Sequence, residues 1–295
     1  MSISGEPVAL VTGAGGQLGQ LLAALAPPEW TVRAFPSGSL DVRDADAVQA
    51  ALLRDRPTVV FNLAAYTAVD AAEAHPSEAE AVNGRGAANV ADGARRVGAR
   101  LVHLSTDFVF DGCQGRPYLP DARPNPLNVY GRTKLAGEQA VQRSGPADAV
   151  ILRTQWLHAT RGRNFVHAML HAMRERPELG VVSDQVGSPT SARGLAAALW
   201  ALAGRPTVGG ILHWADAGVA SWYDFAVAIQ EEGLALGLLD RPVRVHPIRT
   251  GELPAAARRP AFSVLDTADA CRALGVTPEH WRVGLRETLA GLTRG

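Results

Sequence analysis

Lysine is almost absent from this chain of 295 residues. Of its 29 basic residues only Lys134 is a lysine, so the other 28 are arginine. Basic and acidic residues both number 29, which gives a formal net charge of zero and a pI of about 7.1. Nucleic-acid-binding scaffolds usually present a basic face. The charge balance therefore argues against such a scaffold, and we expect no nucleic-acid partner.

Cysteines and long apolar runs are also scarce. The two cysteines, Cys113 and Cys271, are far apart and fit no metal-ligand spacing, so we expect reduced thiols, no metal site and a cytoplasmic location. The longest apolar runs, such as residues 195–203, are far shorter than the ~20 residues that span a bilayer. No basic segment followed by an apolar stretch opens the chain, so we expect neither a signal peptide nor a membrane partner.

Short apolar runs alternate with helical segments through the first half. Strands are expected at residues 8–12, 31–35, 58–62 and 101–105, with helices at 45–53, 77–97 and after residue 128. This alternation predicts an α/β fold, a Rossmann-type doubly wound parallel sheet. The regularity weakens after residue 151, which indicates a smaller, discontinuous C-terminal lobe. The expected division is a dinucleotide-binding domain at 1–155 with a returning segment near 190–215, and a substrate lobe at 156–190 and 216–295.

A glycine-rich turn joins the first expected strand to a helix. Gly13, Gly16 and Gly19 recur in it, with Gln17 and Leu18 between the last two. Glycines there let the backbone approach a pyrophosphate, and the helix N-terminus supplies free N–H groups. The sequence thus predicts a dinucleotide site, although a purely structural tight turn would show the same glycines.

The tip of the second expected strand bears on the choice of cofactor. NAD-preferring folds usually carry an acidic residue there for the ribose 2′-hydroxyl. Here the tip is Phe35-Pro36-Ser37, without an acid and without an evident arginine clamp. We therefore expect NADPH, with NADH use left open.

The one lysine follows Tyr130 by four residues, so the two lie on the same helical face. An ammonium near a phenol favours the phenolate, so we expect Lys134 to lower the pKa of Tyr130. A phenol tuned in this way can act as a general acid or base. A Tyr-x-x-x-Lys spacing also arises by chance, and an arginine-biased composition depletes lysine without any chemistry.

Several motifs together resemble the dTDP-4-dehydrorhamnose reductase family of the extended short-chain dehydrogenases/reductases, over most of the chain. They are Gly16-Gln-Leu-Gly19, Asn62-Leu-Ala-Ala-Tyr-Thr-Ala-Val-Asp70, Ser105-Thr-Asp-Phe-Val-Phe-Asp-Gly112, Tyr130-Gly-Arg-Thr-Lys-Leu-Ala-Gly-Glu138, Leu152-Arg-Thr-Gln-Trp156, Asn164-Phe-Val, Asp184-Gln-Val-Gly-Ser-Pro-Thr190 and Ser221-Trp-Tyr-Asp-Phe225. The resemblance implies an NADPH-dependent reduction of the C4 keto group of a dTDP-4-dehydro-6-deoxyhexose, dTDP-4-dehydro-L-rhamnose in the family's own reaction.

The resemblance also implies roles for individual residues. Tyr130 would donate the proton, Lys134 would hold the nicotinamide ribose, and Thr106 would bind the substrate carbonyl. Asp107 and Trp156 match positions that line the sugar pocket. Five further residues match stretches around the cofactor: Asp41, Val42, Ala64, Ala65 and Tyr66. A turn or cap role for 105–107 and a plain core role for Trp156 stay open.

The chain departs from the family pattern at two places. Thr154-Gln155-Trp156-Leu157-His158 stands where Thr-Ser-Trp-Val-Tyr is usual, and Phe262 stands where Asn is usual. These changes leave the exact sugar substrate open. A 4-ketoreductase acting on another dTDP-deoxysugar is therefore an alternative. A non-catalytic NADP-binding regulatory subunit is a further alternative. A dehydratase is disfavoured because Phe108 follows Asp107 where a second acid would be needed. A homodimer and a metal between subunits stay open.

Overall fold

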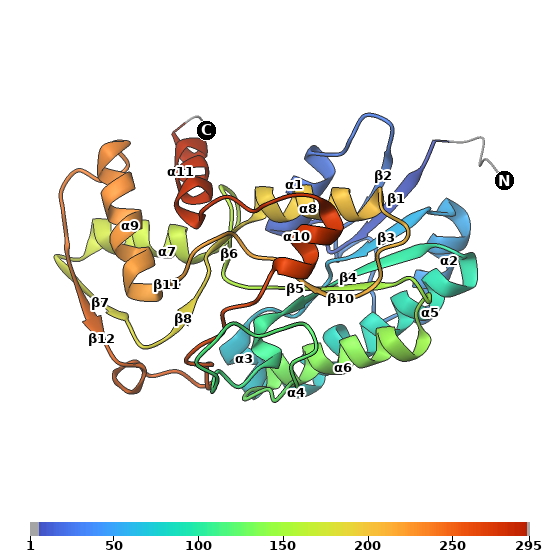
Figure 1. Cartoon of the computed structure of the whole chain (residues 1–295), viewed down its shortest axis with the longest axis horizontal. Helices are drawn as coiled ribbons and strands as arrows, with labels where there is room; N and C mark the ends of the chain where they lie inside the picture. Colours follow the sequence, from blue (N-terminus) through green and yellow to red (C-terminus); the bar gives the residue numbers. More distant parts are fainter. Residues whose placement is uncertain (1–5, 294–295) are drawn as a thin grey trace.

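A computed structural model describes residues 6–293, and its main feature is a six-stranded parallel sheet (Figure 1). The strand order is β2–β1–β3–β4–β5–β10. The strands are β1 (Val8–Thr12), β2 (Thr31–Phe35), β3 (Val59–Asn62), β4 (Arg100–Thr106), β5 (Val150–Thr154) and β10 (Gly210–His213). The direction of winding reverses between β1 and β3. Open α/β sheets bind ligands at such a switch point, beyond the carboxyl ends of the strands.

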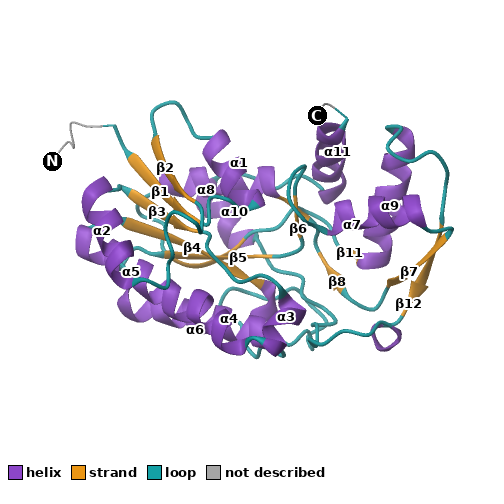
Figure 2. Ribbon diagram, turned by 180° about the vertical axis from the view of Figure 1, so that it is seen from behind, coloured by secondary structure: helices purple, strands orange, loops and turns teal. Residues whose placement is uncertain are grey.

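Helices cover both faces of this sheet (Figures 1 and 2). One face carries α1 (Gln17–Ala24), α8 (Ala192–Ala203) and α10 (Ala268–Leu274). The other carries α2 (Ala45–Asp55), α5 (Ala87–Val97) and α6 (Val129–Ser144), with α3 (Val69–Ala74) and α4 (Pro76–Glu80) nearby. A π-helical segment, η1 (Ala81–Gly86), joins α4 to α5, and the short 3-10 turn η2 (Asp107–Val109) follows β4. The helix expected over 77–97 is thus one run interrupted by a π turn.

The remaining elements form a smaller lobe beside the sheet (Figure 1). Its helices are α7 (Phe165–Glu175), α9 (Trp222–Ala235) and α11 (Trp281–Leu292), and a short 3-10 turn is η3 (Thr250–Glu252). Three two-stranded ladders pair β7 (Glu178–Val182) with β12 (Arg244–Ile248), β8 (Val186–Gly187) with β11 (Ala220–Ser221), and β6 (Leu157–His158) with β9 (Thr190–Ser191). Segments distant in sequence are thereby held together.

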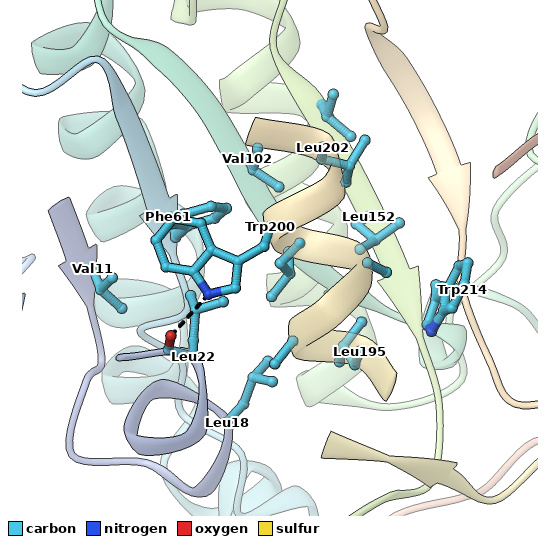
Figure 3. Close-up of a cluster of buried hydrophobic side chains, with 14 of the residues drawn as sticks. Val11, Leu18, Leu22, Phe61, Val102, Leu152, Leu195, Trp200, Leu202 and Trp214 are labelled. Atoms are coloured by element: carbon cyan, nitrogen blue, oxygen red, sulfur yellow. Dashed lines mark hydrogen bonds between the residues drawn. The ribbon is translucent and has the colours of Figure 1, made fainter. Parts of the chain in front are cut away.

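Each part has a hydrophobic core of its own. The larger cluster under α1 and α8 includes Leu22, Phe61 and Trp200, and the Trp200 indole N–H donates to the Leu22 carbonyl at 2.9 Å (Figure 3). The smaller lobe has a separate cluster around Phe225 and Trp281. Because the two cores are distinct, we propose the division expected from the sequence, with α8 and β10 belonging to the dinucleotide domain, except that α10 packs on the core of that domain and not on the smaller lobe.

Most expected elements exist close to the expected bounds, and the differences have local causes. The last helix, α11, begins at Trp281, with His280 capping it. Ser221 caps α9, and Asp224 completes a reciprocal capping box. Helix α10 was not expected; it has only seven residues and too short an apolar pattern to be recognised.

Candidate active site

The glycine-rich turn forms a tight cradle at the carboxyl end of β1. Gly13 has a φ of +67°, and a Cβ there would lie 2.6 Å from the backbone nitrogen of Ala64. At Gly19 a Cβ would lie 2.6 Å from the Cα of Ala14. Gly16 is the N-cap of α1 without a side-chain cap, so the first N–H groups of the helix remain available. A backbone without side chains at these positions, beside a helix N-terminus, can approach a dinucleotide pyrophosphate closely.

Buried polar side chains lie beneath the cradle and connect three strands. The Thr12 hydroxyl donates to Asn62 Oδ1 at 2.7 Å, and Asn62 Nδ2 lies 3.0 Å from His103 Nδ1. Burial, and then the charge of Lys134, hold the pKa of His103 well below its ordinary value. The imidazole is therefore neutral, and it lies close enough to Lys134 to sense its charge.

The segment after β3 is fixed by a residue that sequence reasoning missed. Asn83, in the π turn, accepts from the Tyr66 N–H at 2.8 Å and donates to the Tyr66 carbonyl at 3.1 Å. Its amide also donates to Thr133 at 3.0 Å. One buried amide thus ties the expected cofactor stretch Ala64–Tyr66 to the helix that carries Tyr130. An asparagine within an alanine-rich helix was the available signal.

The N-terminus of α6 is set against the end of β4. Asn128 caps the helix by accepting from the Gly131 N–H at 2.8 Å. Gly131 packs so closely that a Cβ would lie 2.2 Å from the carbonyl oxygen of Phe108, and the Phe108 and Tyr130 rings meet edge to face at 5.5 Å. This contact places Tyr130 beside the residues that follow β4.

Thr106, Asp107 and Tyr130 lie together. The Thr106 hydroxyl donates to Asp107 Oδ1 at 3.0 Å, and both residues lie close enough to the Tyr130 phenol to affect its pKa. Burial raises the pKa of Asp107 to about 6, although the nearby hydroxyls of Ser263 and Thr106 oppose the shift. Oδ2 of Asp107 has no hydrogen-bond partner among residues 6–293. The structure therefore brings the three expected residues into contact and leaves a carboxylate oxygen free for a ligand.

The expected lowering of the Tyr130 pKa is wrong for this structure. Burial raises the pKa of Tyr130 to about 12, the nearby Thr106 hydroxyl acts to lower it, and the charge of Asp107 acts to raise it. The Lys134 ammonium instead donates to the Leu104 carbonyl at 2.7 Å. Burial lowers the pKa of Lys134 to about 8, against the opposing charge of Glu138. Desolvation thus outweighs the charge–charge effect on which the expectation depended.

A buried ion pair fixes α6 one turn beyond Lys134. Glu138 accepts from Arg153 Nε at 2.8 Å and from its terminal nitrogen at 2.7 Å, and it also accepts from the Ser105 hydroxyl. Both charged side chains are almost fully buried. The pair joins α6 to β4 and β5, and it could not be predicted because the partners lie on different elements.

Other expected residues lie apart from this group. Asp41 is half-buried and pairs with Arg43 at 2.6 Å, and the Arg43 guanidinium lowers the pKa of that carboxyl. Val42 is buried, and its carbonyl accepts from Asn89 at 2.9 Å. Whether Asp41 and Val42 contact the cofactor stays a prediction.

Three residues of the second half have structural partners. Trp156 has a φ of +45° and stacks on Trp222 at 3.5 Å between ring centroids. It is half-buried, so it can line a pocket while supporting the smaller lobe. Asp184 accepts hydrogen bonds from the backbone N–H and the hydroxyl of Thr250, and so braces that turn. Arg259 pairs with Asp70 at 2.6 Å.

Residues 6–293 contain no group of three or more His, Cys, Asp or Glu side chains placed to hold a metal ion. Within the same residues, no helix combines the length and apolar character needed to cross a membrane.

Comparison with known proteins identifies the family. A family model described as "RmlD substrate binding domain" matches residues 8–294. A dTDP-4-dehydrorhamnose reductase of Aggregatibacter actinomycetemcomitans is 39% identical over 288 residues, 95% of this chain and 98% of its own. The chain belongs to the dTDP-4-dehydrorhamnose reductase family. A dTDP-4-keto-6-deoxy-D-glucose reductase of Streptomyces niveus is 42% identical over 281 residues, 94% of this chain and 95% of that protein.

A solved structure agrees over nearly the whole chain. The dTDP-4-dehydrorhamnose reductase of Bacillus anthracis, in complex with NADP, superposes with a TM-score of 0.91 at 36% identity, covering 97% of this chain and 99% of that one. The family resemblance and the Rossmann-type fold expected from the sequence are thereby confirmed.

Proposed function

We propose that this protein reduces the C4 keto group of a dTDP-4-dehydro-6-deoxyhexose with NADPH, and that its product is dTDP-L-rhamnose from dTDP-4-dehydro-L-rhamnose. The expectations of an NAD(P)H-dependent oxidoreductase and of NADPH are confirmed at the level of the family. The observation that carries the residue assignment is the packing of Tyr130 against Phe108, which brings the phenol beside Thr106 and Asp107 at the end of β4.

The dinucleotide would be held by the cradle and its surroundings. Gly13, Gly16 and Gly19 leave room for the pyrophosphate, and Gln17 and Leu18 begin the helix that faces it. The lack of an acid after β2 suits a 2′-phosphate. When bound, the reduced nicotinamide supplies a hydride.

Tyr130 is suited to donate the matching proton. With a pKa of about 12 the phenol stays protonated at neutral pH, which is the form a reduction requires. The alkoxide that forms when hydride reaches C4 is more basic than phenolate, so proton transfer from Tyr130 to O4 runs downhill. We assign Thr106 to the substrate carbonyl, where its hydroxyl helps to orient O4 toward Tyr130.

Lys134 would act after the transfer rather than before it. Its ammonium is buried close to the site and donates to a backbone carbonyl, so it is positioned to stabilise the phenolate left on Tyr130 and to reach ribose hydroxyls. We assign the sugar pocket to Asp107 and Trp156, from the free carboxylate oxygen and the half-buried indole.

The experiment replaces Tyr130 by Phe. General acids contribute roughly 10²–10⁴ in rate. We therefore expect turnover to fall at least about a hundredfold while the dissociation constant of NADPH changes little. Tyr118→Phe is the matched control, because that hydroxyl bonds Asp111 outside the site. Unchanged turnover in Tyr130→Phe would show that another group donates the proton.

A second candidate is a 4-ketoreductase acting on a different dTDP-deoxysugar. It is favoured by the Streptomyces niveus relative and by Gln155 and Phe262, which depart from the family pattern near the pocket. Incubation of the protein with each dTDP-4-keto sugar and NADPH, followed by NMR of the product, separates the two. A regulatory subunit without activity would consume no NADPH with either substrate.

A further inference from the structure

A strap formed by residues 256–263 crosses from the smaller lobe to the sheet domain (Figure 1). It follows β12 and η3 in the chain, and it leads to α10, which packs on the core of the dinucleotide domain. Gly112, which follows η2, packs so closely on the strap that a Cβ there would lie 2.5 Å from the backbone nitrogen of Ala261. The strap therefore packs on the segment after β4, next to the residues proposed for the reaction.

The end of the strap is linked to both residues assigned to the sugar pocket. The Ser263 hydroxyl lies close enough to Asp107 to oppose the rise in its pKa. The Ser263 N–H donates to the Val186 carbonyl at 2.9 Å, and Gly187, the next residue, packs on Trp156. A Cβ at Gly187 would lie 2.6 Å from the indole ring. A displacement of the strap would therefore move the wall of this pocket.

Helix α3 fastens both the strap and the start of α6. Asp70 Oδ1 accepts from the Ala257 N–H at 3.0 Å, and the Arg259 guanidinium pairs with the same carboxylate at 2.6 Å. One turn further along α3, Glu73 accepts from the N–H of Val129, the first residue of α6, at 2.7 Å. The strap, α3 and α6 are thereby joined at the point where the helix that carries the proposed proton donor begins.

Asn128 joins the strap to α6 directly. Its buried amide makes two bonds: Oδ1 accepts from the Gly131 N–H at 2.8 Å, and Nδ2 donates to the Arg258 carbonyl at 2.7 Å. An amide carries an acceptor and donors on one group, whereas aspartate, an equally good N-cap, has no donor when ionised. Because Tyr130 follows two residues later, the same amide sets where the strap lies relative to the phenol.

We propose that Asn128 is a positioning residue of the reaction, whose amide holds the strap against the N-terminus of α6 and so fixes the wall of the sugar pocket relative to Tyr130. The pocket itself rests on the proposed function. Capping of α6 requires Oδ1 alone, so the bond from Nδ2 is the one that serves positioning. The glycine cradle is built from β1, α1 and the segment after β3, so NADPH binding should not depend on this bond.

The two bonds of Asn128 are separated by the variants Asn128→Asp and Asn128→Ser. Both side chains keep an oxygen that can accept from the Gly131 N–H, so the cap of α6 remains. Neither can donate to the Arg258 carbonyl, because aspartate is ionised and serine is too short to reach it. We expect both variants to melt close to the unaltered protein, whereas Asn128→Ala, which loses both bonds, should melt at a lower temperature.

The mobility of the strap is measured by the rate at which trypsin cuts the intact chain after Arg258, which is exposed, with the fragments identified by mass spectrometry. Such cleavage follows the population of the opened segment. We expect rates about twofold to tenfold higher in Asn128→Asp and Asn128→Ser, the factor that one neutral hydrogen bond contributes. Asp70→Asn should also raise the rate, and Asp92→Asn is its matched control, because Asp92 pairs with Arg95 within α5. Rates in both Asn128 variants equal to that of the unaltered protein would overturn the proposal.

The effect on the site is measured by calorimetric titration of dTDP-L-rhamnose, the proposed product, into protein saturated with NADP⁺. We expect its dissociation constant to rise by a similar factor in both variants, the KM of the sugar substrate to rise more than kcat falls, and the NADPH dissociation constant to stay unchanged. Unchanged sugar binding, or an effect confined to Asn128→Asp and so due to its added charge, would overturn the proposal. If the unaltered protein binds no dTDP-L-rhamnose, the proposed function fails, and the trypsin rates still decide whether Asn128 holds the strap.

Discussion

The one lysine offers a direct measurement of the buried charge at the proposed site. Burial lowers the pKa of Lys134 from 10.5 to about 8, with Glu138 opposing the shift. Protein labelled with [15N]lysine gives one side-chain signal, because the chain has no other lysine. We expect that signal to titrate near pH 8 in the cofactor-free protein. Glu138→Gln should move the midpoint lower, because it removes the charge that raises it.

The same shift has a consequence for stability. Between about pH 8 and about 10.5 the unfolded chain keeps a proton on Lys134 that the folded chain has released. Unfolding then takes up a proton, so stability rises with pH across that window. The rise should be absent from Lys134→Met, which has no titrating group there. Urea unfolding of both proteins at several pH values measures the difference.

Two results would refute the reasoning about Lys134. A midpoint at or above pH 10 would mean that the ammonium is hydrated and does not lie in the buried position beside the Leu104 carbonyl. A parallel pH dependence of stability in Lys134→Met would mean that other groups cause the rise. Tyr130 is not one of them, since its pKa is raised, so its contribution to stability is lost only above about pH 10.

Three further predictions concern the surroundings of the site. Glu138→Gln leaves a buried guanidinium unpaired and should cost roughly 3–5 kcal/mol in urea unfolding, against less than about 1 kcal/mol for Glu231→Gln at the exposed pair with Arg282; equal costs would contradict the buried pair. Gly13→Ala forces a side chain into a left-handed, crowded position, so the NADPH dissociation constant from cofactor fluorescence should rise at least about tenfold. Gly38→Ala, where a Cβ would meet no atom within 4 Å, should leave the NADPH dissociation constant unchanged. Equal dissociation constants in the two variants would contradict the assignment of the cradle to the dinucleotide. Asp107→Asn should raise the melting temperature at pH 7 but not at pH 4. The folded protein holds a proton on Asp107 up to about pH 6 and the unfolded chain only up to 3.8, so stability of the unaltered protein falls between those pH values. An equal gain in melting temperature at pH 4 would show that the charge of Asp107 is not the cause.

Much of the fold and the broad outline of the site could be predicted from local sequence. The glycines after β1 and the Tyr130–Lys134 spacing are encoded within a few residues, so the cradle and the tyrosine–lysine pair could be predicted, whereas the effect of burial on the Tyr130 pKa could not. The direction of the Lys134 ammonium could not be predicted, because its acceptor, Leu104, lies on another element. The role of Asn83 could not be predicted for the same reason, because its amide bonds two segments that are distant in sequence.

The wrong expectation for the Tyr130 pKa bears on the direction of the reaction. A phenol with a lowered pKa would be partly ionised near neutrality and would serve as a base, which suits oxidation of an alcohol. The buried phenol of this structure stays protonated and serves as an acid, which suits reduction of a ketone. We propose that Lys134 acts after the proton transfer, when its ammonium would stabilise the buried phenolate left on Tyr130. Desolvation thus keeps the proton on Tyr130 until substrate arrives, and the cost of the phenolate that forms afterwards falls to Lys134 to offset.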